Sequence, residues 1–139
     1  MFFNHRSDTK KRRGAAAVEF AMIAPLMILL TFGLVELGRI MLVKQTAIHA
    51  TREGARMAIR PSAEDAEIFD RVNQELALLG ITGATVEMVP SSIEMAEPGS
   101  PVTLRVRIDL GSVSVVPGFF DFAVSDIVAE SSMRRESTE

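Results

Sequence analysis

The pattern of apolar and polar positions begins with a long apolar run. Residues 15–35 contain Glu19 as their only charged side chain. The run is about 21 residues long, or roughly 30 Å as a helix at about 1.5 Å per residue, and this length spans the hydrocarbon core of a bilayer. We therefore predict a transmembrane helix over residues 15–35.

Residues 36–60 continue with a helical period and contain no proline. Small and apolar residues recur every three or four positions, which is typical of a helix with one narrow packing stripe. The stripe consists of Ile40, Val43, Ala47, Ala50, Gly54 and Met57. The opposite side carries Lys44, Arg52, Glu53, Arg56 and Arg60. Pro61 ends the helix, because the residue before a proline disfavours the α region. The pattern predicts one helix over residues 15–59, whose second half is an amphipathic extension.

A short second helix is expected next, in "PSAEDAEIFDRVNQELALLG". Ser62 and Asp65 have the spacing of a capping box, and Gly80 is a typical C-terminal stop. Its apolar face would consist of Phe69, Val72, Leu76 and Leu79.

Strand patterns fill the rest of residues 61–139. Residues 84–89 predict a short strand, and residues 101–111 alternate strictly between apolar and polar side chains. We expect residues 112–116 to extend this strand to a turn at Pro117 and Gly118, and a last strand in residues 125–135. Such alternation gives a strand one buried and one solvated face, which is typical of antiparallel sheets. The predicted fold class is α+β: a long N-terminal helix, a short second helix, and an antiparallel sheet of about three strands packed on the outer half of the long helix.

Charge gives the membrane helix a direction. Five cations and one anion precede Ala15, leaving ten basic and seventeen acidic residues in the rest of the chain. The positive-inside rule places the basic end in the cytoplasm and residues 61–139 outside it, as a periplasmic domain. A secretory signal peptide is the competing interpretation, but it needs small residues after its apolar run. Here "GAAA" precedes the run, so any cut would fall on the cytoplasmic side.

The remaining composition excludes several functions. The acidic body argues against nucleic acid as a partner, and the lack of cysteine excludes disulfides and thiolate metal sites. No nucleophile elbow, phosphate-binding glycine loop or H-E-x-x-H motif occurs. A lone helical histidine, His49, is more typical of a surface or an interface than of a metal site. We expect no enzymatic activity, no cofactor and no metal.

Glu19 is the unusual residue of the apolar run. An acid within a bilayer is costly, so it either reaches the interface without a function or has a cationic partner. Arg12 and Arg13 lie too near the N-terminal end to pair with it while they reach the headgroups. A cut after Gly14 would make the α-amino group of Ala15 a cation at that depth. This amine could reach Glu19 of a neighbouring copy, and the pair would neutralise both charges in lipid.

These residues also carry a family resemblance. "RRGAAAVEFAMIAPLMILLTFGLVELGR", followed by "ATREGARMA", resembles the TadE-like proteins, which are pseudopilins of the Tad (tight adherence) Flp-pilus system. The resemblance covers about residues 12–58. Its marks are Gly14, Val18, Glu19, Phe20, Pro25, Gly33, Glu36, Gly38, Arg39, Arg52, Glu53, Gly54, Ala55 and Arg56.

The resemblance implies a pilin-like fold and proteolytic maturation. A prepilin peptidase would cut between Gly14 and Ala15, removing residues 1–14 as a basic leader peptide. Glu19 and Phe20 would then form the assembly and processing motif of the mature chain. Pro25 has two interpretations: a kink that the bilayer tolerates, or a point of local unwinding when subunits pack.

The expected function is that of a minor pseudopilin of a type IV-like Tad/Flp pilus, acting in pilus assembly and adhesion. Its implied partners are the prepilin peptidase, other pilins and pseudopilins, and the assembly platform of the bacterial inner membrane. It would cross this membrane once and join a hetero-oligomeric filament. The alternative is an uncleaved single-pass anchor that displays a small periplasmic protein-binding domain for a secretion or assembly machine.

Overall fold

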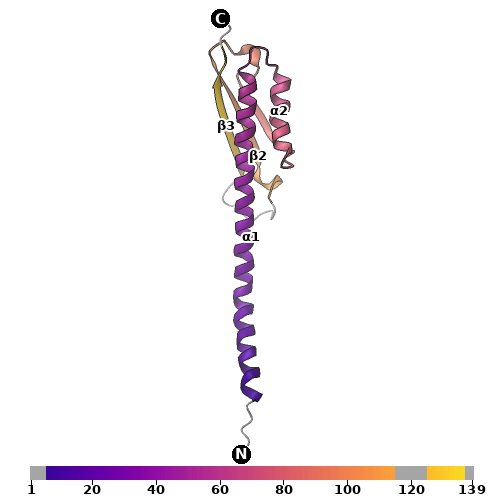
Figure 1. Ribbon diagram of the computed structural model, residues 1–139, viewed down its shortest axis with the longest axis vertical. Coiled ribbons are helices and arrows are strands. Elements are labelled where there is room, and N and C mark those ends of the chain that lie inside the picture. The colour runs from indigo at the N-terminus through magenta and orange to yellow at the C-terminus, as the bar shows by residue number, and fades with distance from the viewer. Residues whose placement is uncertain (1–5, 115–124, 137–139) are drawn as a thin grey trace, which may run out of the picture. The chain divides into compact units, whose positions relative to one another are not determined.

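The computed structural model describes residues 6–114 and 125–136. The chain divides into two compact units, Met1–Val35 and Glu36–Glu139, called the first and the second unit below. Figure 1 shows the order of the elements along the chain. They are α1 (Arg6–Ala58), α2 (Asp65–Ala77), β1 (Thr85–Val89), the 3₁₀ turn η1 (Ile93–Met95), β2 (Pro101–Asp109), the 3₁₀ turn η2 (Leu110–Ser112) and β3 (Asp126–Arg134).

The first unit is helical from Arg6 onward, nine residues before the apolar run begins. α1 passes through Pro25 without interruption. Its large apolar side chains, such as Phe20 and Leu26, project outward and are more than half exposed. Within the described residues, α1 is long and apolar enough between Gly14 and Ala58 to cross a membrane. A fully exposed apolar surface of this size fits a lipid environment better than water.

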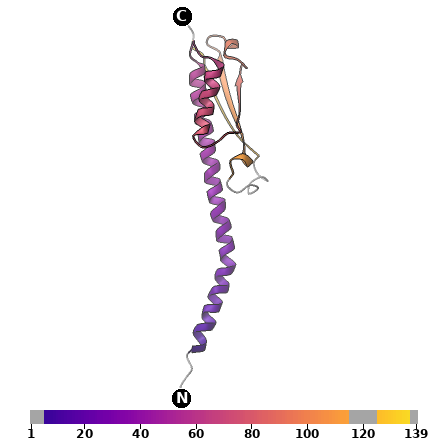
Figure 2. The ribbon, with the colours of Figure 1, turned by 90° about the vertical axis from the view of Figure 1, so that its right-hand side faces the viewer.

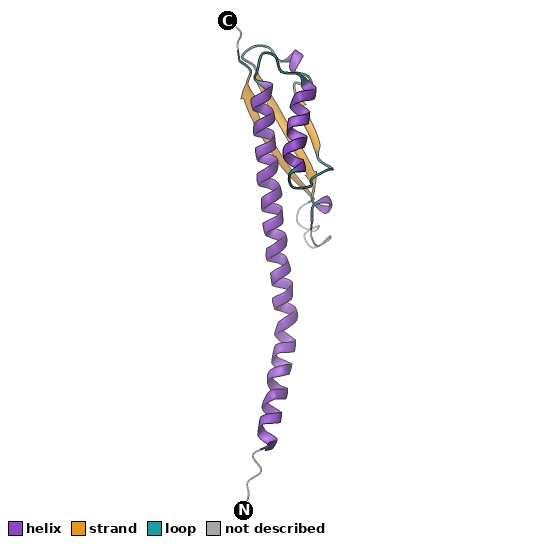
Figure 3. Cartoon of the chain, turned by 45° about the vertical axis from the view of Figure 1, so that its right-hand side comes forward, coloured by secondary structure: helices purple, strands orange, loops and turns teal. Residues whose placement is uncertain are grey.

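The second unit contains the rest of α1, together with α2 and the sheet. The sheet is antiparallel, with the strand order β1-β2-β3. β2 lies in the middle, with Thr103 opposite Val89 in β1 and opposite Ser132 in β3. Figures 2 and 3 show the two helices as one layer and the sheet as the other. The predicted α+β fold class is therefore confirmed.

The core lies between these two layers. One face of β2 supplies the residues of the predicted apolar side, and all of them are buried: Val102, Leu104, Val106 and Ile108, followed by Leu110 in η2. α1 contributes its predicted stripe, with Val43, Ala47 and Ala50 fully buried. Thr51 is buried beside this stripe, and its Oγ1 lies 3.0 Å from Oγ of Ser131 in β3. Small residues on α1 thus let the sheet lie close to the helix.

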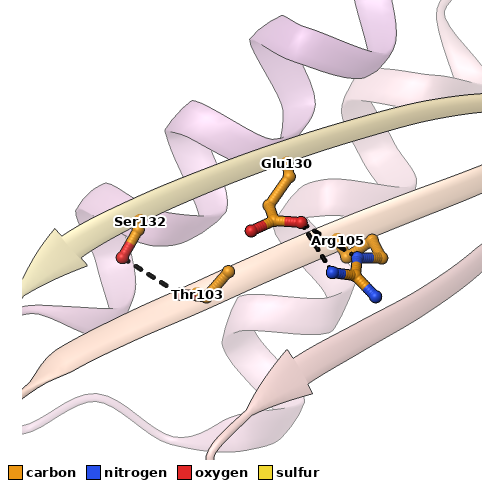
Figure 4. A network of polar contacts seen from close by, with 4 residues as sticks. All are labelled: Thr103, Arg105, Glu130 and Ser132. Atoms are coloured by element: carbon orange, nitrogen blue, oxygen red, sulfur yellow. Dashed lines mark hydrogen bonds and ion pairs between the residues drawn. The ribbon is translucent and has the colours of Figure 1, made fainter.

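The other face of the sheet is polar, as the alternation predicts. Arg105 donates from Nε and Nη2 to one carboxylate oxygen of Glu130, at 3.0 and 2.8 Å, across the β2–β3 pair (Figure 4). Two residue pairs further along the strands, Oγ1 of Thr103 donates to Oγ of Ser132 at 3.0 Å. The hydrogen bonds and the charge of Glu130 raise the pKa of Arg105 above its ordinary value. All four side chains lie on a wet surface, so these contacts contribute more to strand register than to stability.

The capping box predicted at Ser62 and Asp65 is wrong. α2 begins at Asp65, and the residue before it, Glu64, makes no capping hydrogen bond through its side chain. Asp65 Oδ1 instead accepts a hydrogen bond of 2.7 Å from the backbone N–H of Ile93 in η1. The carboxylate of Asp65 therefore holds η1, a segment 28 residues further along the chain, against the start of α2.

The predicted apolar face of α2 packs on the core, and Ile68 is a further buried residue beside it. Ile68, Val72 and Leu76 are the buried residues of α2, whereas Phe69 and Leu79 are only half-buried. Ile68 and Val72 lie next to Gly54 of α1, which sets the side of α2 that turns inward.

The predicted extension of the second strand is also wrong where the structure describes it. Asp109 Oδ1 accepts a hydrogen bond of 3.0 Å from the backbone N–H of Gly111. This bond closes the 3₁₀ turn η2 and ends the strand. Residues 115–116 and the expected turn at Pro117 and Gly118 lie outside the described residues.

Gly80 ends the second helix, as the sequence predicts. Its φ of 70° lies in the left-handed region that favours glycine. The N–H of Gly80 donates to the carbonyl of Ala77 at 2.9 Å, and the N–H of Ile81 donates to that of Leu76 at 3.2 Å. These two bonds are the pattern of a Schellman motif.

We expect Gly80→Ala to destabilise the protein, because an L-residue in the left-handed region costs about 1 kcal/mol. For a domain of this size, that cost lowers Tm by roughly 5 °C. Thermal unfolding of the detergent-solubilised protein, followed by circular dichroism, measures this shift. Gly83→Ala is the matched control, since Gly83 has no positive φ and a Cβ there would meet nothing within 4 Å. Equal Tm values for the two variants would contradict the assignment.

Candidate functional site

The first group of candidate residues lies on α1 in the first unit. Gly14, Ala15, Glu19 and Phe20 are all helical and exposed, and Phe20 is 72% exposed. A Cβ at Gly14 would meet nothing within 4 Å. Among the residues whose side chains are described, none forms an ion pair with Glu19. This group is therefore open to another molecule, such as a peptidase, a lipid or a second helix.

The geometry within this group follows from the helix. Ala15 and Glu19 are four residues apart, so they lie on one face of α1, about 6 Å apart along the axis. Helical side chains lean toward the N-terminus, so the carboxylate of Glu19 leans toward Ala15. Phe20 is the next position and presents a large apolar ring. Phe20 therefore lies about 100° around the helix from Glu19, so its ring borders the face that carries the acid. An acid with apolar neighbours can recognise a cation in an apolar setting.

Pro25 and Gly33 complete the candidates of the first unit. Both lie within α1, and the helix at Pro25 is not unwound. The helix of the single chain therefore accommodates Pro25. Local unwinding at Pro25 when subunits pack stays a prediction.

Glu36 and Arg39 lie in the second unit and have partners within it. Glu36 is 1% exposed, and its carboxylate accepts a hydrogen bond from Oγ of Ser114. Arg39 Nε donates to the backbone carbonyl of Val113 at 3.2 Å. Buried charged groups need such hydrogen-bond partners, because leaving them unpaired is costly. The two side chains hold the segment after η2 against α1, an internal role that the sequence pattern did not indicate.

Gly54 marks the closest approach of three elements. A Cβ built on it would lie 2.5 Å from Cγ2 of Val72 in α2 and 2.7 Å from Cδ1 of Leu104 in β2. Side chains do not come this close, so only glycine fits here without movement of a neighbour. The glycine of the "REGAR" sequence therefore sets the packing of both helices and the sheet.

The charged residues around Gly54 point the other way. Arg52 and Arg56 are exposed, and Glu53 is half-buried. Glu53 and Arg56 form only a loose ion pair, at 3.8 Å. The sequence thus alternates between inward small residues and outward arginines, as expected for one helix with one packed face. Gly38 differs from Gly54, since a Cβ at Gly38 would meet nothing within 4 Å.

The described part of the chain shows no metal-binding arrangement. Within residues 14–114 and 125–136, whose side chains are described, no three His, Asp or Glu side chains are grouped closely enough to hold an ion. His49, the histidine of the long helix, is exposed on α1.

Comparison with known proteins bears on the candidate residues directly. Residues 14–56 match the model of a protein family described as TadE-like protein. No curated protein and no solved structure matches the chain. The matched range begins at Gly14 and ends at Arg56, so it contains every candidate residue of the cleavage site and of the family motif. The resemblance inferred from the sequence is therefore confirmed over this range, and together with the long apolar helix it fits a minor pilin of a Tad pilus.

We expect Gly54→Ala to destabilise the second unit, because an added methyl group would overlap Val72 and Leu104. Overpacking a core in this way costs about 1–3 kcal/mol, which is roughly 5–15 °C in Tm. Gly38→Ala is the matched control on the same helix. It should leave Tm unchanged or raise it, since alanine favours a helix by up to about 1 kcal/mol over glycine. Thermal unfolding in detergent compares the two variants, and a Gly54→Ala protein as stable as the control would contradict the packing argument.

Proposed function

We propose, from the TadE-like match over residues 14–56, that the protein is a minor pseudopilin of a Tad/Flp pilus system. In this proposal a prepilin peptidase removes residues 1–14, and the mature chain acts in pilus assembly and adhesion. The observation that carries the proposal is the exposed group Gly14, Ala15, Glu19 and Phe20, which lies at the start of the exposed apolar stretch of α1.

Several features support cleavage after Gly14. The basic residues before it would hold the site at the cytoplasmic face of the membrane. Gly14 has no side chain and no close neighbours, which suits entry into a peptidase cleft. The cut would leave Glu19 as the fifth residue of the mature protein.

Assembly then depends on the charge created by the cut. In lipid, the new α-amino group of Ala15 and the carboxylate of Glu19 are each costly when alone, and less costly as a pair. If the pair forms between neighbouring subunits, it neutralises both charges and fixes the register of two apolar helices. The partners are therefore other pilins or pseudopilins, together with the inner-membrane assembly platform.

The proposed location is the bacterial inner membrane, with the N-terminus in the cytoplasm and residues 61–139 in the periplasm. The acidic body and the absence of catalytic motifs support a structural protein rather than an enzyme.

One observation favours a second candidate function. The second unit is compact on its own and has its own buried core. A membrane anchor that is never cleaved could display such a unit as a periplasmic protein-binding domain. Maturation separates the two functions, since only a pseudopilin loses residues 1–14.

We expect co-expression with a prepilin peptidase to shorten the protein to a chain that begins at Ala15, as measured by intact mass. Gly14→Val should retain the full-length precursor, because its side chain would obstruct the cleft. This variant leaves the fold intact, since nothing lies within 4 Å of a Cβ at this position. Gly38→Ala is the control and should be cleaved normally. An intact N-terminus in the unsubstituted protein would support the uncleaved anchor instead.

We expect Glu19→Val to be cleaved and inserted but to lose assembly, because the amine of Ala15 then has no partner. Incorporation into pili should fall by roughly tenfold or more, which corresponds to about 1.4 kcal/mol. Immunoblots of sheared pili and of membranes measure incorporation and insertion separately. Thr31→Val is the matched control, since Thr31 is also an exposed polar residue of α1 and bonds only to the carbonyl of Met27. Normal incorporation of Glu19→Val would refute the pairing.

A further inference from the structure

The apolar surface of α1 ends later in the structure than the sequence predicts. From the sequence, the membrane segment stops at Val35, because Glu36 and Arg39 follow. In the structure both charges lie on the side of α1 that packs against residues 113–114. Ser114 hydrogen-bonds to Glu36, and Arg39 donates to the carbonyl of Val113. The two charges therefore do not interrupt the outward surface of this part of the helix.

That outward surface is apolar up to Leu42. Leu37, Met41 and Leu42, called the apolar patch below, are 42%, 59% and 48% exposed. The first exposed charge after them is Lys44, followed by the exposed Gln45. Large exposed apolar side chains that lie together mark a surface with a partner.

Length and position identify this partner as the lipid surface. Residues 36–42 follow the apolar run directly and span about 10 Å of helix. The headgroup zone of each leaflet adds about 5–8 Å to the hydrocarbon core, so this part of α1 is long enough to cross that zone. Lys44 would then lie just beyond the headgroups, and its long side chain can reach back to the lipid phosphates.

We infer that the apolar patch lies in the interfacial zone of the outer leaflet. The inference rests on the proposed insertion of residues 15–35 into the membrane. Glu36 and Arg39 then have a second role, because their hydrogen bonds to residues 113–114 keep their charges away from lipid. The lipid-contacting surface of α1 therefore extends seven residues beyond the segment that the sequence predicts.

The test uses the natural lack of cysteine in this chain. Single variants Met27→Cys, Met41→Cys, Leu42→Cys and Gln45→Cys each receive a nitroxide label in detergent. All four positions are exposed, so each substitution leaves the core unchanged, and circular dichroism verifies this. The full chain is then placed at low density in vesicles of phosphatidylethanolamine and phosphatidylglycerol. Power-saturation electron paramagnetic resonance measures contact of each label with oxygen, which enriches in lipid, and with a nickel chelate, which stays in water.

We expect Met41 and Leu42 to behave as interfacial positions, with oxygen contact above that at Gln45 and below that at Met27. Nickel contact should be roughly tenfold lower than at Gln45, because a polar chelate is excluded from apolar surroundings. Water-type behaviour at Met41 and Leu42, with Met27 in lipid, overturns the inference and leaves membrane insertion intact. Low contact with both probes at Met41 and Leu42 also overturns it, since protein then covers the patch. Water-type behaviour at Met27 refutes insertion itself, and the inference with it.

Discussion

The structure depends on one constraint: an apolar helix without a protein core around it must lie in an apolar medium, where each polar group needs a partner. The backbone of α1 meets this requirement by itself, because its hydrogen bonds are internal to the helix. Charged side chains do not meet this requirement without a partner. Residues 15–35 therefore carry a single charge, at Glu19, and on the C-terminal side of this run charges return from Glu36 onward, where α1 belongs to the second unit.

Glu19 and Glu36 show two ways to meet this constraint. Glu36 is buried within the second unit and has a hydroxyl partner in Ser114, so its carboxylate serves the packing of its own chain. Glu19 is exposed on α1, and the described side chains offer it no ion pair. Both residues lie within the TadE-like match. The matched segment thus combines an outward part, suited to other subunits, with an inward part that includes Glu36, Arg39 and Gly54.

Local patterns predicted most of this fold. The alternation in β2 and the stripe on α1 are consequences of the strand and helix periods, and both appear in the core as expected. Contacts between distant segments were not predictable in this way. Asp65 has the spacing of a capping box, yet it bonds to Ile93, and Arg39 bonds to a carbonyl 74 residues away. Gly54 was assigned to the packing stripe, but only the positions of Val72 and Leu104 explain why it is glycine.

We propose that the chain is matured after Gly14 and that its new N-terminus serves in a filament. The most direct measurement is the N-terminal residue of the protein recovered from both the membranes and the sheared pili of cells that make the pilus. We expect a chain that begins at Ala15 in both fractions. A chain that keeps residues 1–14 in the membrane and is absent from the pili would contradict it.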